Sequence, residues 1–147
     1  MGNPMSETNY ETETAETNVT QIREFEARVE KVSSIVWELI ALWTKLTLSM
    51  EEKEDRDVIP WSEASHPKKQ STWDCIVALL ATPNMTAETY HEMWRAKEIE
   101  KGWKYGPEFK PEAMENFNLV AWPELGEEVR KGYNLFFGFA KVVIQSL

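Results

Sequence analysis

A regular apolar repeat between Asn18 and Met50 constrains this chain more than any other feature. Nonpolar residues recur there in alternating steps of three and four, the spacing that keeps side chains on one face of a helix. No proline or glycine occurs between Asn18 and Val58, and Asn18 with Gln21 fits a capping box at the helix start. We therefore expect a helix over residues 18–50. Its repeat consists of Ile22, Phe25, Val29, Val32, Val36, Leu39, Trp43, Leu46 and Met50.

What covers this stripe is a separate question. Ile35, Ile40 and Leu42 widen it in its second half. A two-stranded coiled coil would leave these three side chains exposed, whereas a four-helix assembly, or docking on the rest of the chain, would cover them. A helix of about 30 residues is about 45 Å long, too long for the remaining domain to cover completely. We expect self-association into a homo-oligomer through residues 18–50, with dimer and tetramer both open.

The segments beside the helix are strongly charged. Residues 1–17 are rich in Glu, Thr and Asn and have almost nothing to bury, so we expect a disordered acidic tail. Residues 51–58 read as a charged linker. The whole chain has 25 acidic and 16 basic residues, a net charge of −9. This charge repels nucleic-acid phosphates, so we exclude binding to nucleic-acid polymers, although a small phosphorylated ligand in a local basic pocket stays possible.

Residues 59–147 have the pattern of a compact helical domain. Pro67 follows a helix start at Ser65 or His66, and Thr86 is a typical N-cap residue. The fold we expect is mainly α: the long helix plus a compact four-element domain with at most one short strand pair. Its predicted pieces are helices from residue 65 or 66 to 82, from 86 to about 101 and from about 126 to 145, an aromatic loop over 102–107 and an extended piece over 119–123.

Several function classes find little support in the sequence. Cys75 is the one cysteine, and it lies in an apolar run, which favours a core thiol over a nucleophile. Two histidines and one cysteine give no zinc-site spacing, and no residues suggest a catalytic arrangement or a bound cofactor. No apolar run approaches the ~20 residues of a membrane span, and no signal peptide is recognisable. We expect a non-enzymatic cytoplasmic protein without a metal or a membrane partner.

Aromatic and basic residues alternate between His91 and Tyr105. His91 and Trp94 share one helical face, Trp103 and Tyr105 follow in the loop, and lysines lie between them. Aromatic planes beside cations suit a planar anionic ligand, because rings stack on a base and cations neutralise phosphate. Tryptophans at helical spacing are also common in protein cores.

The order His91-Glu92-Met93-Trp94 and then Gly102-Trp103-Lys104-Tyr105-Gly106-Pro107 resembles the signature of the RyR domain family. Residues 59–64 and 119–125 are similar to flanking segments of its stand-alone bacterial and phage members, so the resemblance covers about residues 59–145. It implies a helix-rich binding module without catalytic residues. Trp94 would be the stacking platform, Trp103 and Tyr105 would shape the pocket, and His91 would lie nearby.

The sequence departs from the family at several positions. Glu98 stands where the family has a basic residue four positions after the signature tryptophan, and Lys97 beside it points about 100° away. Asn116-Phe117 replaces a His-Pro pair. We therefore expect a pocket that is more aromatic and less basic than the family norm. The expected ligand-binding residues are Trp94, Trp103, Tyr105, His91, Lys97, Lys104, Lys110 and Trp122.

The resemblance implies a function in binding. We expect a protein that sequesters or senses a nucleotide-derived small molecule, either cyclic or ADP-ribose-like. By this resemblance, we expect a phage-encoded sponge that would counter antiviral signalling in the host cytoplasm. The alternative is a protein–protein adaptor whose aromatic face docks a partner. An enzyme that degrades a nucleotide is the third interpretation, and the residues offer it little support.

Overall fold

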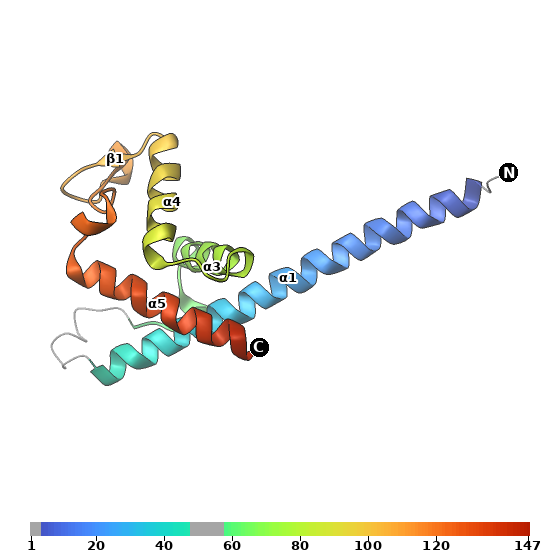
Figure 1. The fold of residues 1–147 in the computed structure, drawn as a ribbon, viewed down its shortest axis with the longest axis horizontal. Helices are drawn as coiled ribbons and strands as arrows, with labels where there is room; N and C mark the ends of the chain where they lie inside the picture. Colours follow the sequence, from blue (N-terminus) through green and yellow to red (C-terminus); the bar gives the residue numbers. More distant parts are fainter. Residues whose placement is uncertain (1–3, 48–57) are drawn as a thin grey trace.

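The computed structural model describes residues 4–47 and 58–147, with side chains described from residue 12 onward, and it confirms a mainly helical fold (Figure 1). One short parallel strand pair accompanies the helices, with Lys104 opposite Glu115. Helix α1 extends far beyond the other elements, which gather around its second half. The elements are α1 (Pro4–Thr47), a 3₁₀ turn (Trp61–Glu63), α3 (His66–Ala81), α4 (Ala87–Glu100), β1 (Lys104–Tyr105), a 3₁₀ turn (Pro111–Ala113), β2 (Glu115–Asn116), a 3₁₀ turn (Trp122–Glu124) and α5 (Glu127–Ser146).

Helix α1 begins earlier than the sequence predicts. It starts at Pro4 rather than Asn18, so the tail expected to be disordered is helical from residue 4. Proline is well tolerated at the first helical position, where its missing N–H would have no partner anyway. No proline or glycine follows until beyond Val58, so nothing in the backbone ends the helix at the predicted cap. The helix ends at Thr47, and residues 51–57 of the predicted linker lie outside the described residues.

Helix α1 consists of two parts with different surroundings. Side chains 12–28, which we call the arm, are all exposed. Beyond them Val29, Val32 and Val36 are 0% exposed and belong to one core cluster with Ile76 of α3 and Phe137 of α5. The arm is the part of the long helix that projects from the domain in Figure 1. The chain's own domain therefore covers the middle of the apolar stripe and leaves its N-terminal part open.

Polar contacts also fix α1 to the segment that leads into α3. The indole Nε1 of Trp61 donates to Glu30 at 2.8 Å, and the Trp61 backbone N–H donates to Glu38 at 2.8 Å. In return, Nε1 of Trp37 donates to the Ile59 carbonyl at 2.8 Å. The two indole rings meet edge to face with centroids 5.7 Å apart. The second half of α1 is thus a structural part of the domain.

The remaining helices agree with the sequence prediction. Thr86 caps α4 as expected, because its hydroxyl accepts from the Thr89 N–H at 3.1 Å. The predicted extended piece at residues 119–123 is wrong in its second half. There Trp122–Glu124 forms a 3₁₀ turn, with Pro123 at a position where its fixed φ suits a turn. None of the helices in residues 4–47 and 58–147 is long and apolar enough to cross a membrane.

Ser33 is a weak point in the seam between α1 and the domain. Its side chain is 0% exposed, and its hydroxyl has no hydrogen-bond partner in the part of the chain that the structure describes. A buried hydroxyl without a partner is unfavourable, and alanine is a better helix former than serine. We therefore expect Ser33→Ala to raise the free energy of unfolding by about 1 kcal/mol.

Urea denaturation followed by circular dichroism measures this change. The neighbouring Ser34 is a matched control, because it is partly exposed and its hydroxyl donates to the Lys31 carbonyl at 2.9 Å. Ser34→Ala should change the stability by less than about 0.5 kcal/mol. A destabilised Ser33→Ala protein would mean that the buried hydroxyl has a partner in solution.

Candidate functional site

Tyr90 and Trp94 divide the groove between α3 and α4 into two hollows. They lie one helical turn apart on α4, and both line each hollow. The first, which we call the lysine hollow, has a volume of about 450 Å³ and includes Lys97 and Lys101. The second, which we call the amide hollow, has a volume of about 420 Å³ and is bounded by β2 and α5 as well. Trp94 thus stands between two cavities of ligand size.

The lysine hollow has a balanced set of charges. Asp74 and Glu98 line it together with Lys97 and Lys101. The Lys101 ammonium lies 3.2 Å from the Glu98 carboxylate, so one of the two cations is already paired. A wall with two cations and two carboxylates attracts a single phosphate far less than a purely basic pocket would. This agrees with the weakly basic site expected from Glu98.

The amide hollow is neutral, aromatic and polar. The side chains that line it carry no charge, and they include four aromatic rings, two carboxamides and four hydroxyls. The Asn116 side-chain oxygen accepts the Asn118 backbone N–H at 2.8 Å, which fixes the first carboxamide at the end of β2. Aromatic faces and amide groups together can hold the two faces and the edge of a planar heterocycle. The side chains that matter most are Tyr90, Trp94, Tyr133, Asn116, Asn118 and Ser71.

The ionisable groups of the amide hollow stay neutral at physiological pH. Burial, the largest cause, raises the pKa of the Cys75 thiol from 9.0 to about 11. Burial likewise raises the pKa of Tyr133 to about 12 and moves that of Tyr90 upward. A thiol with so high a pKa is a poor nucleophile. Cys75 is only partly exposed and hydrogen-bonded to Tyr90, which favours the core thiol expected from the sequence.

His91, one of the expected ligand-binding residues, lies in the interior of the domain. Its side chain is 0% exposed and lines neither hollow. Its Nε2 lies 2.8 Å from the Val120 carbonyl oxygen, which can only accept, so Nε2 carries the proton. Nδ1 then accepts from the Tyr133 hydroxyl at 3.4 Å. His91 is a positioning residue at the centre of an aromatic cluster, with ring centroids 5.6 Å from Trp94, 6.0 Å from Trp122 and 5.6 Å from Tyr133.

Glu92 holds the turn at Trp122 against α4. One carboxylate oxygen accepts the Trp122 backbone N–H at 2.8 Å, and the other accepts from Arg95 at 3.2 Å. The bond from the Trp122 N–H is the main cause that lowers the pKa of Glu92, with Arg95 adding to it. Trp122 therefore lies behind Trp94, beside His91, rather than on the lining of either hollow.

Four predicted ligand residues lie on a separate flap, defined here as residues 102–117. Trp103 stacks on Phe109 with an interplanar angle of 8° and centroids 6.0 Å apart. Tyr105 is 57% exposed, and the Lys104 ammonium lies 3.8 Å from Glu115. The Lys110 ammonium lies 3.6 Å from the Glu108 carboxylate. None of Trp103, Lys104, Tyr105 and Lys110 lines the two hollows beside Trp94.

A close backbone contact shapes the flap. A Cβ atom at Gly106 would lie 2.5 Å from a carboxylate oxygen of Glu115, so any larger residue would push the strand pair apart. Gly102 has a φ of +102°, which only glycine adopts easily. The two glycines of the signature loop therefore have conformational and packing roles.

Several residues of the hollows are absent from the predicted site. Tyr90 precedes Trp94 by four residues, and this spacing places the two on one face. Asn116 stands where the family has a His-Pro pair. This difference from the family was the sequence signal that could have identified Asn116 as a residue of the hollow. Tyr133 and Asn118 carried no such signal, because nothing local in the sequence brings them to α4.

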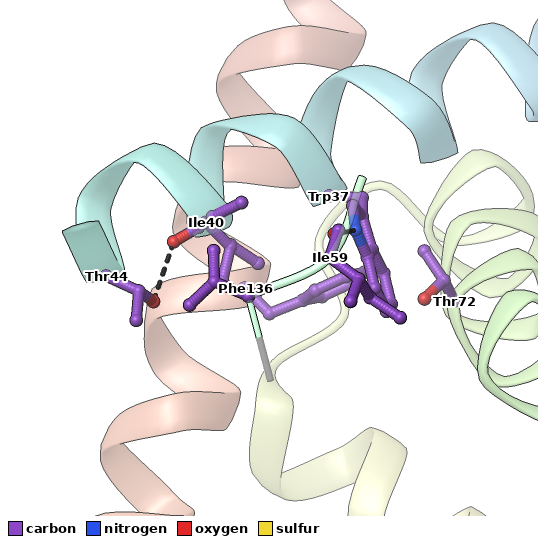
Figure 2. Close-up of a pocket in the computed structure, with 8 residues that line it drawn as sticks. Trp37, Ile40, Thr44, Ile59, Thr72 and Phe136 are labelled. Carbon is purple, nitrogen blue, oxygen red and sulfur yellow. Dashed lines mark hydrogen bonds between the residues drawn. The ribbon is translucent and has the colours of Figure 1, made fainter. Parts of the chain in front are cut away.

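A third hollow, of about 290 Å³, lies between α1, α5 and the segment before Trp61 (Figure 2). Its walls are mainly apolar. The Thr44 hydroxyl donates to the Ile40 carbonyl at 2.8 Å, and the Thr72 hydroxyl donates to the Lys68 carbonyl at 3.1 Å. These donors are already used within the chain, so this hollow is a gap in the α1 seam rather than a recognition site. Across the described residues, no group of three or more His, Cys, Asp and Glu side chains could hold a metal.

Part of the chain matches a known protein family. The model of the RyR domain family matches residues 66–136, from the first residue of α3 into α5. The matched segment contains Trp94, the residues of α4 that line the two hollows, and the whole flap. No curated protein matches the chain. Residues 66–136 therefore contain an RyR domain, the family that the signature residues resemble.

Proposed function

We propose that this chain is a non-catalytic protein that binds a nucleotide-derived small molecule in the α3–α4 groove. The observation that carries the proposal is the position of Trp94 and Tyr90 between a neutral amide hollow and a hollow that contains lysines. A nucleotide has the same two parts, a planar base and an anionic group. The groove offers a suitable surface to each.

The chemistry of the hollows narrows the ligand class. A base fits the amide hollow, where Trp94, Tyr90 and Tyr133 supply rings and Asn116 and Asn118 supply amide groups. A phosphate fits beside Lys97, the cation of the lysine hollow that forms no ion pair with any described residue. The charges there balance, so we favour a ligand with one phosphate, or a ribose-containing cyclic or ADP-ribose-like molecule, over a triphosphate.

Binding without chemical change fits the neutral walls of the groove. The raised pKa values of Cys75 and Tyr133 work against a nucleophile or a general base at this place. We place this binding in the cytoplasm, where nucleotides are made and used. A protein that holds such a molecule intact lowers its free concentration, as a phage-encoded sponge does to a defence signal.

A panel of linear and cyclic nucleotides tests the proposal. At least one member should raise the melting temperature, because a ligand that binds the folded state stabilises it by mass action. Trp94→Ala should abolish this shift. Trp103→Ala is the matched control, since Trp103 lines neither hollow, and it should keep the shift. A panel without any response, or equal loss in both variants, would refute a nucleotide site at Trp94.

The exposed aromatic residues of the flap favour a second candidate, a protein–protein adaptor. Tyr105, Phe109 and Phe117 are 57%, 56% and 48% exposed. Exposed aromatic side chains are common at protein interfaces. For this candidate, a stoichiometric protein should co-purify with the chain and be lost in Phe109→Ala, while Trp94→Ala keeps it.

A further inference from the structure

The arm carries an apolar stripe that no part of the described chain covers. Val19, Ile22 and Phe25 are 45%, 57% and 44% exposed. In the helical repeat, Ile22 and Phe25 continue the line of Val29 and Val32, which are fully buried against the domain. The same face of one helix is therefore core in its middle and open to solvent in its arm.

No packing within the described chain supports the arm, because all its side chains are exposed. Glutamate, alanine, arginine and glutamine favour a helix there, whereas its four threonines do not. Isolated helices are only marginally stable in water, and most helices in proteins are stabilised by packing of an apolar face. A partner along the open stripe would therefore stabilise the arm.

The root of the arm also has a concave surface. A hollow of about 600 Å³ lies between the arm and Trp73 of α3, lined by Asn18, Ile22 and Phe25 among others. A groove between an apolar helix face and an indole ring can receive the side chains of a second helix. From Val29 to Ile40 the stripe packs against the chain's own core, and the hollow at the root of the arm favours a partner there over the exposed Trp43 and Leu46 at the other end of α1.

We infer that the arm of a second copy of this chain covers the stripe, so that the protein is a dimer joined through residues 12–28. This goes beyond the proposed ligand binding and does not depend on it. The second copy is favoured by continuity with the buried stripe and by the residues along the seam, which are uncharged: Ala15, Asn18, Ile22 and Phe25. Identical seams then meet without repulsion between like charges.

Asn18 strengthens the choice of an identical partner. It lies on the stripe between Ala15 and Ile22, where an apolar residue would give a stronger but less specific contact. A carboxamide both donates and accepts hydrogen bonds, so two copies of Asn18 can satisfy each other. The charged Arg23 and Glu24 lie outside the apolar stripe and face away from the seam.

Sedimentation equilibrium of the full chain tests the inference. The wild-type protein should have twice the chain mass of 17.1 kDa. Ile22→Glu/Phe25→Glu should weaken the dimer by about 100-fold or more, because two charges enter an apolar seam. Thr20→Glu/Ala27→Glu adds the same charge on the opposite face, where glutamate is well tolerated in a helix, and this variant should remain a dimer.

Both double variants change exposed residues, so their near-ultraviolet spectra should match the wild type. A wild-type mass of one chain at the highest soluble concentration would overturn the inference, and would leave the stripe to a different protein. A dimer that survives Ile22→Glu/Phe25→Glu would overturn it too, because the contact would then lie elsewhere. Neither outcome would contradict the proposed ligand binding, which the nucleotide panel tests separately.

Discussion

A chain that lacks residues 1–47 is expected not to fold, whereas a chain that lacks only residues 1–26 is expected to fold like the full-length protein. The first deletion removes Val29, Val32 and Val36, which are all 0% exposed. Burial of each valine contributes about 1.5–3 kcal/mol, so the three together approach the roughly 5–15 kcal/mol that keeps a domain folded. The deletion also removes both partners of Trp61, Glu30 and Glu38. The second deletion ends before the first buried residue of α1.

Thermal unfolding followed by near-ultraviolet circular dichroism separates the two chains. The shorter deletion should give a cooperative transition close to that of the full-length protein. The longer one should give a spectrum without tertiary signal at every temperature. A cooperative transition in the chain without residues 1–47 would show that residues 58–147 form the domain alone. For the same reason, loss of assembly after removal of the whole helix would not by itself locate the interface, because such a chain is expected to unfold.

The sequence predicted most of the helices because their ends carry local signals. Thr86 and Pro67 mark starts, and Pro83 marks a stop, by steric and hydrogen-bonding rules that act over a few residues. The α1 stripe was equally visible, but a repeat shows only which face is apolar. It does not show what covers that face. Only the packing of α3 and α5 separates the core part of the stripe, from Val29 to Ile40, from the open arm before it.

The candidate site was also predicted only in part. The missing residues are again those that packing between distant segments brings together. Trp94 and Lys97 were found because aromatic and basic residues cluster along α4, and both line the lysine hollow. The exposure of His91 was not predictable, because it depends on Tyr133 and on the turn at Val120, which lie far away in the sequence. Trp103, Lys104, Tyr105 and Lys110 of the flap follow Trp94 in the signature but line neither of its hollows. A single sequence does not show whether a residue of the signature shapes the fold or contacts a ligand.

His91→Phe is expected to lower the free energy of unfolding by about 2–3 kcal/mol. Phenylalanine keeps a ring in the cluster but cannot donate to the Val120 carbonyl, which His91 reaches at 2.8 Å. The penalty is the lost hydrogen bond plus the desolvation of the carbonyl left without a partner. His91→Ala should cost about 3–5 kcal/mol, because it adds a cavity to the same losses. Tyr133→Phe removes only the 3.4 Å contact to Nδ1 and should cost less than about 1 kcal/mol.

Urea denaturation of these variants, together with the ligand panel, separates positioning from contact. His91 touches Trp94 but is not exposed, so His91→Phe should reduce stability strongly and ligand affinity only slightly. Trp94→Ala should instead reduce ligand affinity strongly, because Trp94 lines both hollows. If His91→Phe abolished ligand binding in a protein that still unfolds cooperatively, His91 would have to reach the ligand directly. The buried hydrogen-bonded ring would then have to leave its place between Val120 and Tyr133 when the ligand binds.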